Sequence, residues 1–413
     1  MLARTFHYAA LSLSAEAADA AALDWLGEFL APAYTAAAAH DVAAAWTVRL
    51  AVDPPDYARC TARRRGGEAV AFLLDSGPAR LPLHDADGPG LLAHDAELGV
   101  CYRLEAAGAG AGGQVLVLAG SDRARVRSAL MRPLRELGMD AARQRGGLLL
   151  HAAACALHGR AVLIAGPKQA GKTSLLTYLL SVGRQAGEGP GDGAGAALLG
   201  NDRVLIEATG AGPRAYGVPT VVSIRRGTLA LFPALWQQVQ QARFRLHATL
   251  AECADATAPP ARLWPDGRLG LTAAQYCAAC SCGAAAFASA ALLLFPRRTG
   301  APGGLRLQRL GRAESLRRIG ACRLGATTAE VAAGPADRPD KGVGDGLGDR
   351  PEAGIRSALF QALEPGAPAP APAAAARALS SLPAYDCALG NDAFADAGAA
   401  ESLLRLLEGE ANG

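Results

Sequence analysis

The chain has 413 residues, of which 51% are hydrophobic and 19% charged, and its formal net charge is +3. This length predicts two or three structural units, and the nearly neutral charge argues against a nucleic-acid-binding or membrane-surface protein. No apolar run reaches the roughly 20 residues that span a bilayer, and the N-terminus lacks a secretory signal pattern, so we expect a cytoplasmic protein. Nine scattered cysteines are consistent with reduced thiols in that compartment.

Residues 1–145 are predicted to form an N-terminal α/β domain. The spacing of Trp25, Leu26, Phe29 and Leu30 indicates a helix over 24–30, and apolar runs predict strands over 46–52, 69–74 and 114–119. A second helix is expected over 121–137, where Pro133 could kink it. Seven arginines lie between residues 123 and 145. They could bind an acidic substrate, although a solvated helix face is the simpler interpretation.

Residues 146–330 are predicted to form a second α/β domain. Strands are expected over 148–154, 161–165, 196–199, 204–207, 216–226 and 291–296, and helices over 173–180 and 229–242. A tight turn at His158-Gly159 would pair the first two strands as a hairpin. The C-terminal region is low in complexity. We expect a disordered linker over 331–354, then helical segments within 355–413, separated by a Pro/Ala spacer over 365–376.

The sequence GPKQAGKT, residues 166–173, fits the phosphate-binding pattern G-x-x-x-x-G-K-[ST]. An apolar strand leads into it and a helix follows, which is the context that a P-loop requires. Glycines let backbone N–H groups point at phosphate oxygens, and the helix N-terminus adds positive charge. A chance glycine-rich turn is the alternative. The residues expected to contact nucleotide are Gly166, Pro167, Lys168, Gln169, Ala170, Gly171, Lys172, Thr173 and Ser174.

Other polar residues near this motif could carry chemistry. Asp202 follows the strand 196–199, where a carboxylate could hold Mg²⁺ or accept a proton from an attacking hydroxyl, although Asn-Asp also favours a plain turn. His151 lies on the strand before the loop strand and would approach the phosphates if the two pair, or it is structural. Arg203, Arg225 and Arg226 could neutralise a transferring phosphoryl group, or they are surface charges.

Three cysteines, Cys277, Cys280 and Cys282, lie close together in the sequence. They could be a metal or redox motif. A structural zinc site usually needs a second pair at matching spacing, so we interpret the cluster as coincidence within an alanine-rich helix.

A histidine strand, a glycine turn, an apolar strand, the loop, a helix, and then a strand ending in an acid together resemble the HPr kinase/phosphorylase family. The order is more distantly similar to phosphoenolpyruvate carboxykinases. The closer look-alikes are HPr-kinase-related proteins, which are uncharacterised or modify peptides. The resemblance covers roughly residues 148–232. It implies ATP-dependent phosphorylation of a hydroxyl, with Lys172 on the phosphates and Thr173 on Mg²⁺.

The sequence departs from the family pattern in the loop, where Pro167-Lys168-Gln169-Ala170 replaces the usual small residues, and at the end of the strand. In the family the strand ends in two aspartates, the first taken as the base and the second near the metal. Here Asn201 occupies the first position and Asp202 the second. An amide cannot accept the proton at neutral pH. Either Asp202 serves both roles, or His151 is the base, or kinase activity is weak or absent. No segment resembles the family's carrier-protein docking helix, so HPr is not the expected substrate.

Two functions follow from these residues. The first is an Mg²⁺-dependent kinase that transfers the γ-phosphoryl group of ATP to a hydroxyl of a peptide, protein or small molecule. Its catalytic residues would be Asp202, His151 and Lys172, and its metal ligands Thr173 and Asp202. The second is an ATP-binding or ATP-hydrolysing module that regulates or assembles partners. A GTPase is less favoured because the sequence has no convincing N/T-K-x-D motif. Neither nucleic acid nor membrane is an expected partner, and a homo-oligomer is compatible with either function.

Overall fold

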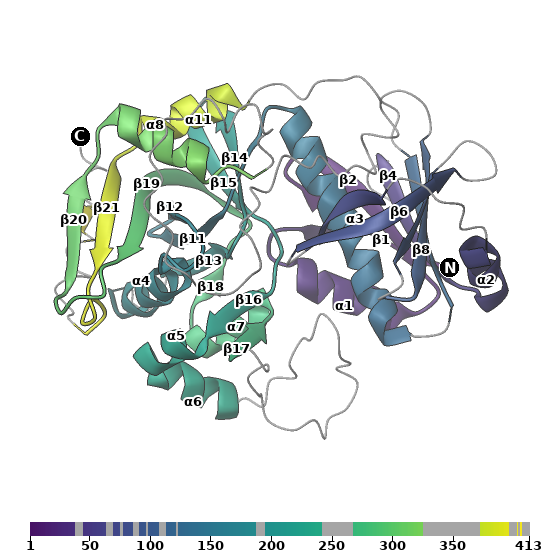
Figure 1. Cartoon of the computed structure of the whole chain (residues 1–413), viewed down its shortest axis with the longest axis horizontal. Helices are drawn as coiled ribbons and strands as arrows, with labels where there is room; N and C mark the ends of the chain where they lie inside the picture. Colours follow the sequence, from purple (N-terminus) through teal and green to yellow (C-terminus); the bar gives the residue numbers. More distant parts are fainter. Residues whose placement is uncertain are drawn as a thin grey trace.

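The computed structural model describes residues 1–37, 44–62, 69–74, 77–85, 91–95, 98–106, 113–120, 123–186, 195–241, 267–324, 372–395, 403 and 405–406. These residues form two neighbouring units, each built around one large sheet (Figure 1). The predicted α/β class is confirmed. The linker predicted over 331–354 and the helix predicted over 355–363 lie outside the described residues. No helix in the described ranges is long and apolar enough to cross a membrane.

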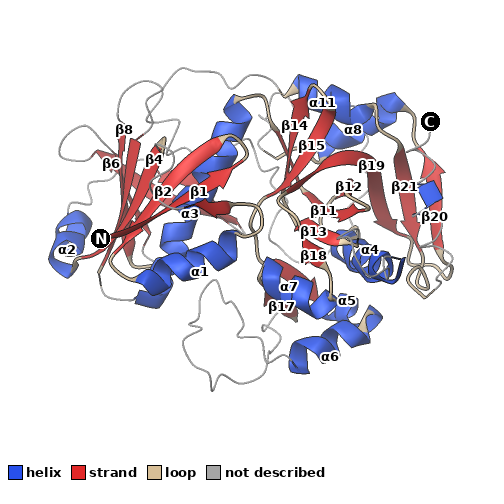
Figure 2. Ribbon diagram, turned by 180° about the vertical axis from the view of Figure 1, so that it is seen from behind, coloured by secondary structure: helices blue, strands red, loops and turns tan. Residues whose placement is uncertain are grey.

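The N-terminal unit has the strand order β3-β1-β2-β4-β9-β8-β7-β6-β5. Its strands are β1 (Leu2–Tyr8), β2 (Leu11–Ala17), β3 (Thr35–Ala37), β4 (Trp46–Val52), β5 (Ala69–Leu74), β6 (Gly77–Asp85), β7 (Leu91–Asp95), β8 (Val100–Ala106) and β9 (Gly113–Ala119). Helices α1 (Ala20–Leu30) and α3 (Arg123–Gln144) pack on one face, and α2 (Pro54–Ala62) packs on the other (Figure 2).

The sequence predicted part of this unit. The strands over 46–52, 69–74 and 114–119 are present as β4, β5 and β9, and the helix over 24–30 begins earlier because Asp19 caps Ala21 N at 3.0 Å. The hairpin of β1 and β2 was not predicted. In β2 the buried positions Leu13, Ala15 and Ala17 alternate with half-buried serines and a glutamate, and inward alanines give a weak apolar signal.

The second unit has the strand order β10-β14-β15-β19-β12-β11-β13-β18, and β21 pairs with β19 and β20. Its strands are β10 (Leu148–Leu150), β11 (Ala152–Leu157), β12 (Arg160–Ala165), β13 (Ala197–Gly200), β14 (Val204–Thr209), β15 (Gly212–Gly217), β18 (Gly283–Ala284), β19 (Phe287–Arg298), β20 (Leu305–Arg309) and β21 (Ala384–Leu389). A small sheet joins β16 (Val222–Arg225) to β17 (Arg268–Leu271).

Helices cover both faces of this sheet. Those on one face are α4 (Lys172–Ala186), α5 (Arg226–Leu231), α6 (Pro233–Gln241) and α7 (Ala273–Cys280). On the other face lie α8 (Arg312–Ala321) and α11 (Ala373–Ser380). In β12, Val162 and Ile164 face α4, whereas Leu163 and Ala165 face α8 and α11. A strand buried on both faces appears in the sequence as a continuous apolar run, which is why β12 was predictable.

Two predicted strands are divided in the structure. The strand predicted over 148–154 breaks at His151, so that β10 pairs with β14 while β11 pairs with β12 and β13. The region 216–226 divides into the end of β15 and the separate strand β16. The predicted hairpin through His158-Gly159 is present as the antiparallel pair β11 and β12.

The C-terminal prediction needs correction. The region 355–413 was predicted as helical segments with an extended spacer to 376, but it contains β21, and α11 begins at Ala373. Alanine is the best helix former, so the spacer becomes helical once its prolines end. Because β21 pairs with β19 in parallel, residues 384–389 belong to the sheet of the second unit.

Four strands of the second unit end on the same side of its sheet, where a ligand site can form. Strands β12, β19 and β21 are parallel, and β13 runs in the same direction because both β12 and β13 are antiparallel to β11. Their C-terminal ends therefore lie at one edge of the sheet. In open α/β sheets, ligands bind at this edge.

Candidate functional site

The loop 166–171 connects β12 with α4 at this edge. Gly171 has φ +106°, a conformation that favours glycine, and Gln169 also has a positive φ of 69°. A Cβ atom on Gly171 would lie 2.6 Å from Leu389 Cδ1. The helix starts at once, with Leu175 N donating to Gly171 O at 2.9 Å. Pro167, Lys168 and Gln169 form the exposed tip of the loop. The remaining predicted nucleotide contacts are buried, apart from half-buried Thr173.

Lys172 is folded back into the loop and is only 8% exposed. Its Nζ donates to Gly166 O at 2.8 Å, to Pro167 O at 3.0 Å and to His151 Nε2 at 2.8 Å. Burial lowers the pKa of Lys172, and the nearby Asp202 carboxylate opposes that shift. Its three N–H groups thus have three acceptors, two of which are carbonyls of the loop itself.

His151 links Lys172 to the end of β13. It occupies the break between β10 and β11, where its backbone N donates to Cys322 O at 2.8 Å. Its Nδ1 lies 3.2 Å from Asp202 O and 3.3 Å from Asp202 Oδ1. A charged lysine can only donate, so His151 Nε2 accepts, and we assign the imidazole hydrogen to Nδ1, where it is donated to Asp202. The three predicted catalytic residues therefore form one hydrogen-bonded chain.

The two residues at the end of β13 point in different directions. Asn201 is buried, and its Oδ1 accepts from Thr173 Oγ1 at 3.3 Å, while its carbonyl accepts from Thr220 Oγ1 at 2.5 Å. Asp202 has φ +76°, which Asp tolerates better than most residues, and its carboxylate faces His151. Thr173 and Asp202 were the predicted metal ligands. In the structure, however, the side chain next to the Thr173 hydroxyl is that of Asn201, not that of Asp202.

Glycine fixes the position of this strand end. A Cβ atom on Gly217 would lie 1.8 Å from Leu199 O, and one on Gly200 would lie 3.1 Å from Gly217 Cα. Only glycine allows β13 and β15 to approach this closely. This close approach sets where Asn201 and Asp202 leave the sheet.

The arginines predicted to neutralise phosphate lie in different places. Arg225 and Arg226 are exposed where β16 meets α5, and Arg203 is largely buried. Arg298, at the C-terminal end of β19, was not predicted from the sequence as a site residue. Its Nη2 lies 3.4 Å from Ser174 Oγ, and its Nε lies 3.9 Å from the position of a Cβ on Gly171. Its place could have been predicted, because Arg297 and Arg298 follow an apolar strand in the sequence just as Asp202 does.

The cysteine cluster lies apart from this chain of contacts, at the end of α7. Cys277, Cys280 and Cys282 form no disulfide bond, and Cys277 Sγ donates to Gly283 O at 3.2 Å. Within the part of the chain that the structure describes, no group of three or more His, Cys, Asp or Glu side chains is arranged to hold a metal ion.

Comparison with protein-family models gives no match, and a search of curated proteins also finds none.

Proposed function

We propose that the chain is an ATP-dependent kinase that transfers the γ-phosphoryl group to a serine or other hydroxyl of a peptide, protein or small molecule. The observation that carries this proposal is the chain of hydrogen bonds from the loop through Lys172 and His151 to Asp202. It combines a buried cation at the start of a helix with a histidine that donates to the carbonyl of Asp202 and lies 3.3 Å from the carboxylate of the same residue. Phosphoryl transfer needs both a phosphate cradle and a group that accepts the hydroxyl proton.

The loop supplies the nucleotide contacts. Phosphate oxygens accept hydrogen bonds as the carbonyls of Gly166 and Pro167 do, so they can take over the ammonium of Lys172 when ATP binds. The exchange also brings a negative charge to a lysine whose charged form is disfavoured by burial. Arg298 adds a second cation above the first turn of α4. Lys168 and Gln169 lie at the exposed tip, where the chain can close over the phosphates.

The oxygen atoms needed for Mg²⁺ are present in part. Thr173 Oγ1 and Asn201 Oδ1 lie 3.3 Å apart, and hydroxyl and amide oxygens are ligands that Mg²⁺ accepts in proteins. These two residues would hold the ion directly. When bound, Mg²⁺ would neutralise charge between the β- and γ-phosphates.

His151 is the better candidate for the base, with Asp202 as its orienting partner. Lys172 Nζ contacts His151 Nε2, while Nδ1 of the same ring donates to Asp202 O. Movement of Lys172 toward phosphate would free Nε2 to accept the proton of the acceptor hydroxyl. Asp202 would then stabilise the imidazolium, as carboxylates do in other acid–base pairs. This division of roles explains how Asn201 can replace the first aspartate without removing the base.

The test is transfer from γ-labelled ATP in the presence of Mg²⁺ to a mixture of serine- and threonine-containing peptides. Wild type should label a peptide, and both Lys172→Ala and Asp202→Asn should reduce labelling. Asp24→Asn, a change of the same chemistry on the N-terminal unit, should not. Release of label only as inorganic phosphate would contradict the proposal.

A second candidate is an ATP-binding or ATP-hydrolysing module that regulates or assembles partners. The contact between Thr173 and Asn201 favours it, because the first strand-end position carries no carboxylate. Partner capture that requires ATP but survives Asp202→Asn would support this function. Loss of all function in Asp202→Asn with intact ATP affinity would exclude it.

A further inference from the structure

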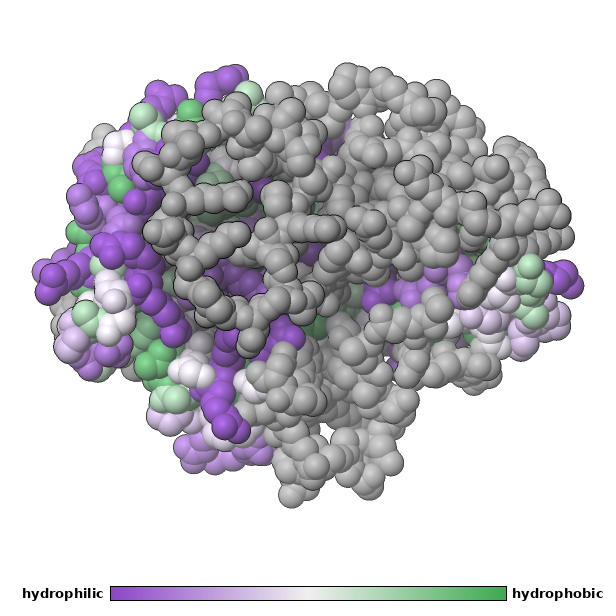
Figure 3. Space-filling view, viewed as in Figure 1, coloured by the Kyte–Doolittle hydropathy of each residue, from purple (hydrophilic) through white to green (hydrophobic). Residues whose placement is uncertain are grey.

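Positive charge is concentrated on and around β19, β20 and α8. Residues 287–324 contain eight arginines and one acidic residue, Glu314. Hydrophilic side chains cover much of the side of the molecule where β20 and β21 lie (Figure 3). We use the term arginine face for Arg297 on β19, Arg306 on β20, and Arg317 and Arg318 on α8.

The strand register places the arginine face beside the site. Arg297 and Arg306 are both paired with Ala388 on β21, so the three residues lie in one row across the sheet. Leu305 and Leu307 pack into the core under α4, so Arg306 points to the opposite face, the one covered by α8. Arg297 directly follows Pro296, whose carbonyl lies 3.6 Å from the position of a Cβ on Gly166. This row is therefore next to the start of the loop.

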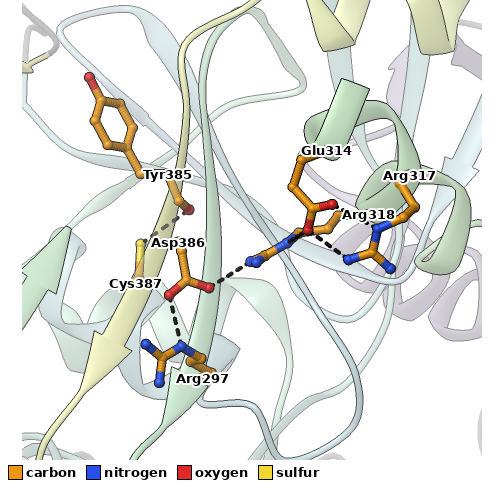
Figure 4. A network of polar contacts seen from close by, with 7 residues as sticks. All are labelled: Arg297, Glu314, Arg317, Arg318, Tyr385, Asp386 and Cys387. Atoms are coloured by element: carbon orange, nitrogen blue, oxygen red, sulfur yellow. Dashed lines mark hydrogen bonds and ion pairs between the residues drawn. The ribbon is translucent and has the colours of Figure 1, made fainter. Parts of the chain in front are cut away.

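Two carboxylates hold three of the four arginines, Arg297, Arg317 and Arg318, in place (Figure 4). Asp386 Oδ2 accepts from Arg297 Nε at 2.8 Å and Asp386 Oδ1 from Arg318 Nη1 at 2.6 Å. Glu314 accepts from Arg318 Nε at 2.7 Å and from Arg317 Nε at 2.7 Å. The Asp386 side chain is 7% exposed, whereas that of Arg297 is 58% exposed. The carboxylate thus lies beneath the guanidinium groups, and four arginines outnumber two acids at the surface.

Helix α8 connects this face to the catalytic candidates. Arg318 and Cys322 are one helical turn apart. The positive charges of Arg318 and Lys172 both act on the Cys322 thiol, although burial dominates and raises its pKa to about 11. The carbonyl of Cys322 accepts from the backbone N of His151. Helix α8 therefore links the arginine face, through Cys322, to the backbone of His151.

We infer that the arginine face binds the phosphoryl acceptor, and that this acceptor is an acidic peptide whose carboxylates flank the hydroxyl. The inference rests on the proposed kinase function. Guanidinium groups already fixed by Asp386 and Glu314 lose little conformational freedom when they bind a second carboxylate. Wild type should therefore prefer acidic acceptors over neutral ones of the same length.

Two features favour a peptide over a nucleic acid. Residues 297–324 contain no aromatic residue, whereas proteins that bind single strands usually stack bases on aromatic rings. Among the described strands, β20 pairs only with β21. Its other edge offers backbone groups to which an extended peptide can add as a strand, with Arg306 beside it.

The experiment compares short synthetic peptides that contain one serine flanked by Glu and Asp, or by Gln and Asn. Transfer from ATP gives KM for each peptide, and fluorescence anisotropy gives the affinity of each labelled peptide without turnover. Arg306→Gln and Arg317→Gln are the test variants. Arg59→Gln, which removes an exposed arginine paired with Asp56 on α2, is the matched control.

Each test variant should raise KM and Kd for the acidic peptide by about fivefold, as expected for one exposed ion pair. Binding of ATP and of the neutral peptide should stay unchanged, and Arg59→Gln should behave as wild type.

Equal KM and Kd for the two peptides would overturn the inference while leaving the kinase proposal intact. Weaker ATP binding in the test variants would assign these arginines to the nucleotide instead. Competition by a single-stranded oligonucleotide as strong as that by the acidic peptide would overturn the peptide assignment. If no peptide is phosphorylated, the proposed function fails, and anisotropy still decides whether the face binds acidic peptides.

Discussion

Replacing His151 with alanine should raise the affinity for ATP and lower the rate of phosphoryl transfer. Lys172 Nζ has three acceptors, Gly166 O, Pro167 O and His151 Nε2, all within 3.0 Å. Phosphate must compete with all three for the ammonium. The His151→Ala change removes one competitor, and a net hydrogen bond of this kind contributes about 1 kcal/mol. ATP should therefore bind about fivefold more tightly to His151→Ala than to wild type.

The same change should slow transfer strongly, because the proposed base is gone. Loss of a general base usually costs a factor of roughly 100 to 10,000 in rate. His151→Gln is the matched control, since its amide oxygen can still accept from Lys172 but cannot take a proton at neutral pH. It should bind ATP as wild type does and transfer as slowly as His151→Ala.

Two measurements check this reasoning, calorimetric titration with ATP and Mg²⁺, and single-turnover transfer from γ-labelled ATP to an acceptor peptide. Full transfer activity in His151→Ala would exclude His151 as the base and return that role to Asp202. A tenfold loss of ATP affinity would show that His151 supports the nucleotide site instead of competing for Lys172.

Three further predictions concern the loop, the second cation and the buried acid. Because Gly171 has a positive φ, Gly171→Ala should destabilise the fold by about 1–3 kcal/mol, measured by urea unfolding, and should weaken ATP binding, measured by calorimetry. The control is Gly227→Ala, whose added Cβ meets nothing within 4 Å and which should be close to neutral. Arg298→Gln should weaken ATP binding by about two- to fivefold without changing the unfolding midpoint, and an unchanged ATP affinity would remove Arg298 from the site. Asp386→Asn should lower the free energy of unfolding at pH 7 by about 1–3 kcal/mol, less than for a fully buried pair because its arginine partners reach solvent. Burial raises the pKa of Asp386, but hydrogen bonds from Arg318 and Arg297 lower it overall, and those from Arg317 and Arg318 lower the pKa of Glu314 to about 2. The contribution of each carboxylate to stability is therefore complete above its pKa in the unfolded chain, about 4, and is lost as the pH falls through its lower pKa in the folded protein. The difference between wild type and Asp386→Asn should shrink as the pH falls below about 4.

The local sequence pattern was sufficient to predict those elements whose residues form a continuous apolar run or a glycine-rich turn. Strand β12, the loop and the start of α4 were predictable because a doubly buried strand and a glycine-rich turn have local sequence signals. Strand β21 was not, since its place beside β19 depends on pairing between residues almost 100 positions apart. Alanine-rich strands such as β2 were also missed, because alanine on an inward face contrasts little with serine.

The candidate site was predictable in composition but not in geometry. The sequence identified Lys172, His151 and Asp202, and the pairing of neighbouring strands suggested that His151 lies near the phosphates. It gave no sign that the positive φ of Asp202 turns its carboxylate toward His151 and leaves Asn201 facing Thr173. Arg298 and the arginine face depend on the register of β19, β20 and β21, which no local pattern reports.

The most direct test of the account is calorimetric titration of wild type and Lys172→Ala with ATP and Mg²⁺. Wild type should bind ATP, and Lys172→Ala should lose roughly 1.5–3 kcal/mol of binding free energy, about 10- to 150-fold in affinity, because a charged partner of phosphate is removed. A thermal unfolding scan of each protein confirms that the variant is folded. Equal ATP affinity in the two proteins, or no ATP binding by wild type, would contradict the claim that residues 166–173 form the nucleotide site.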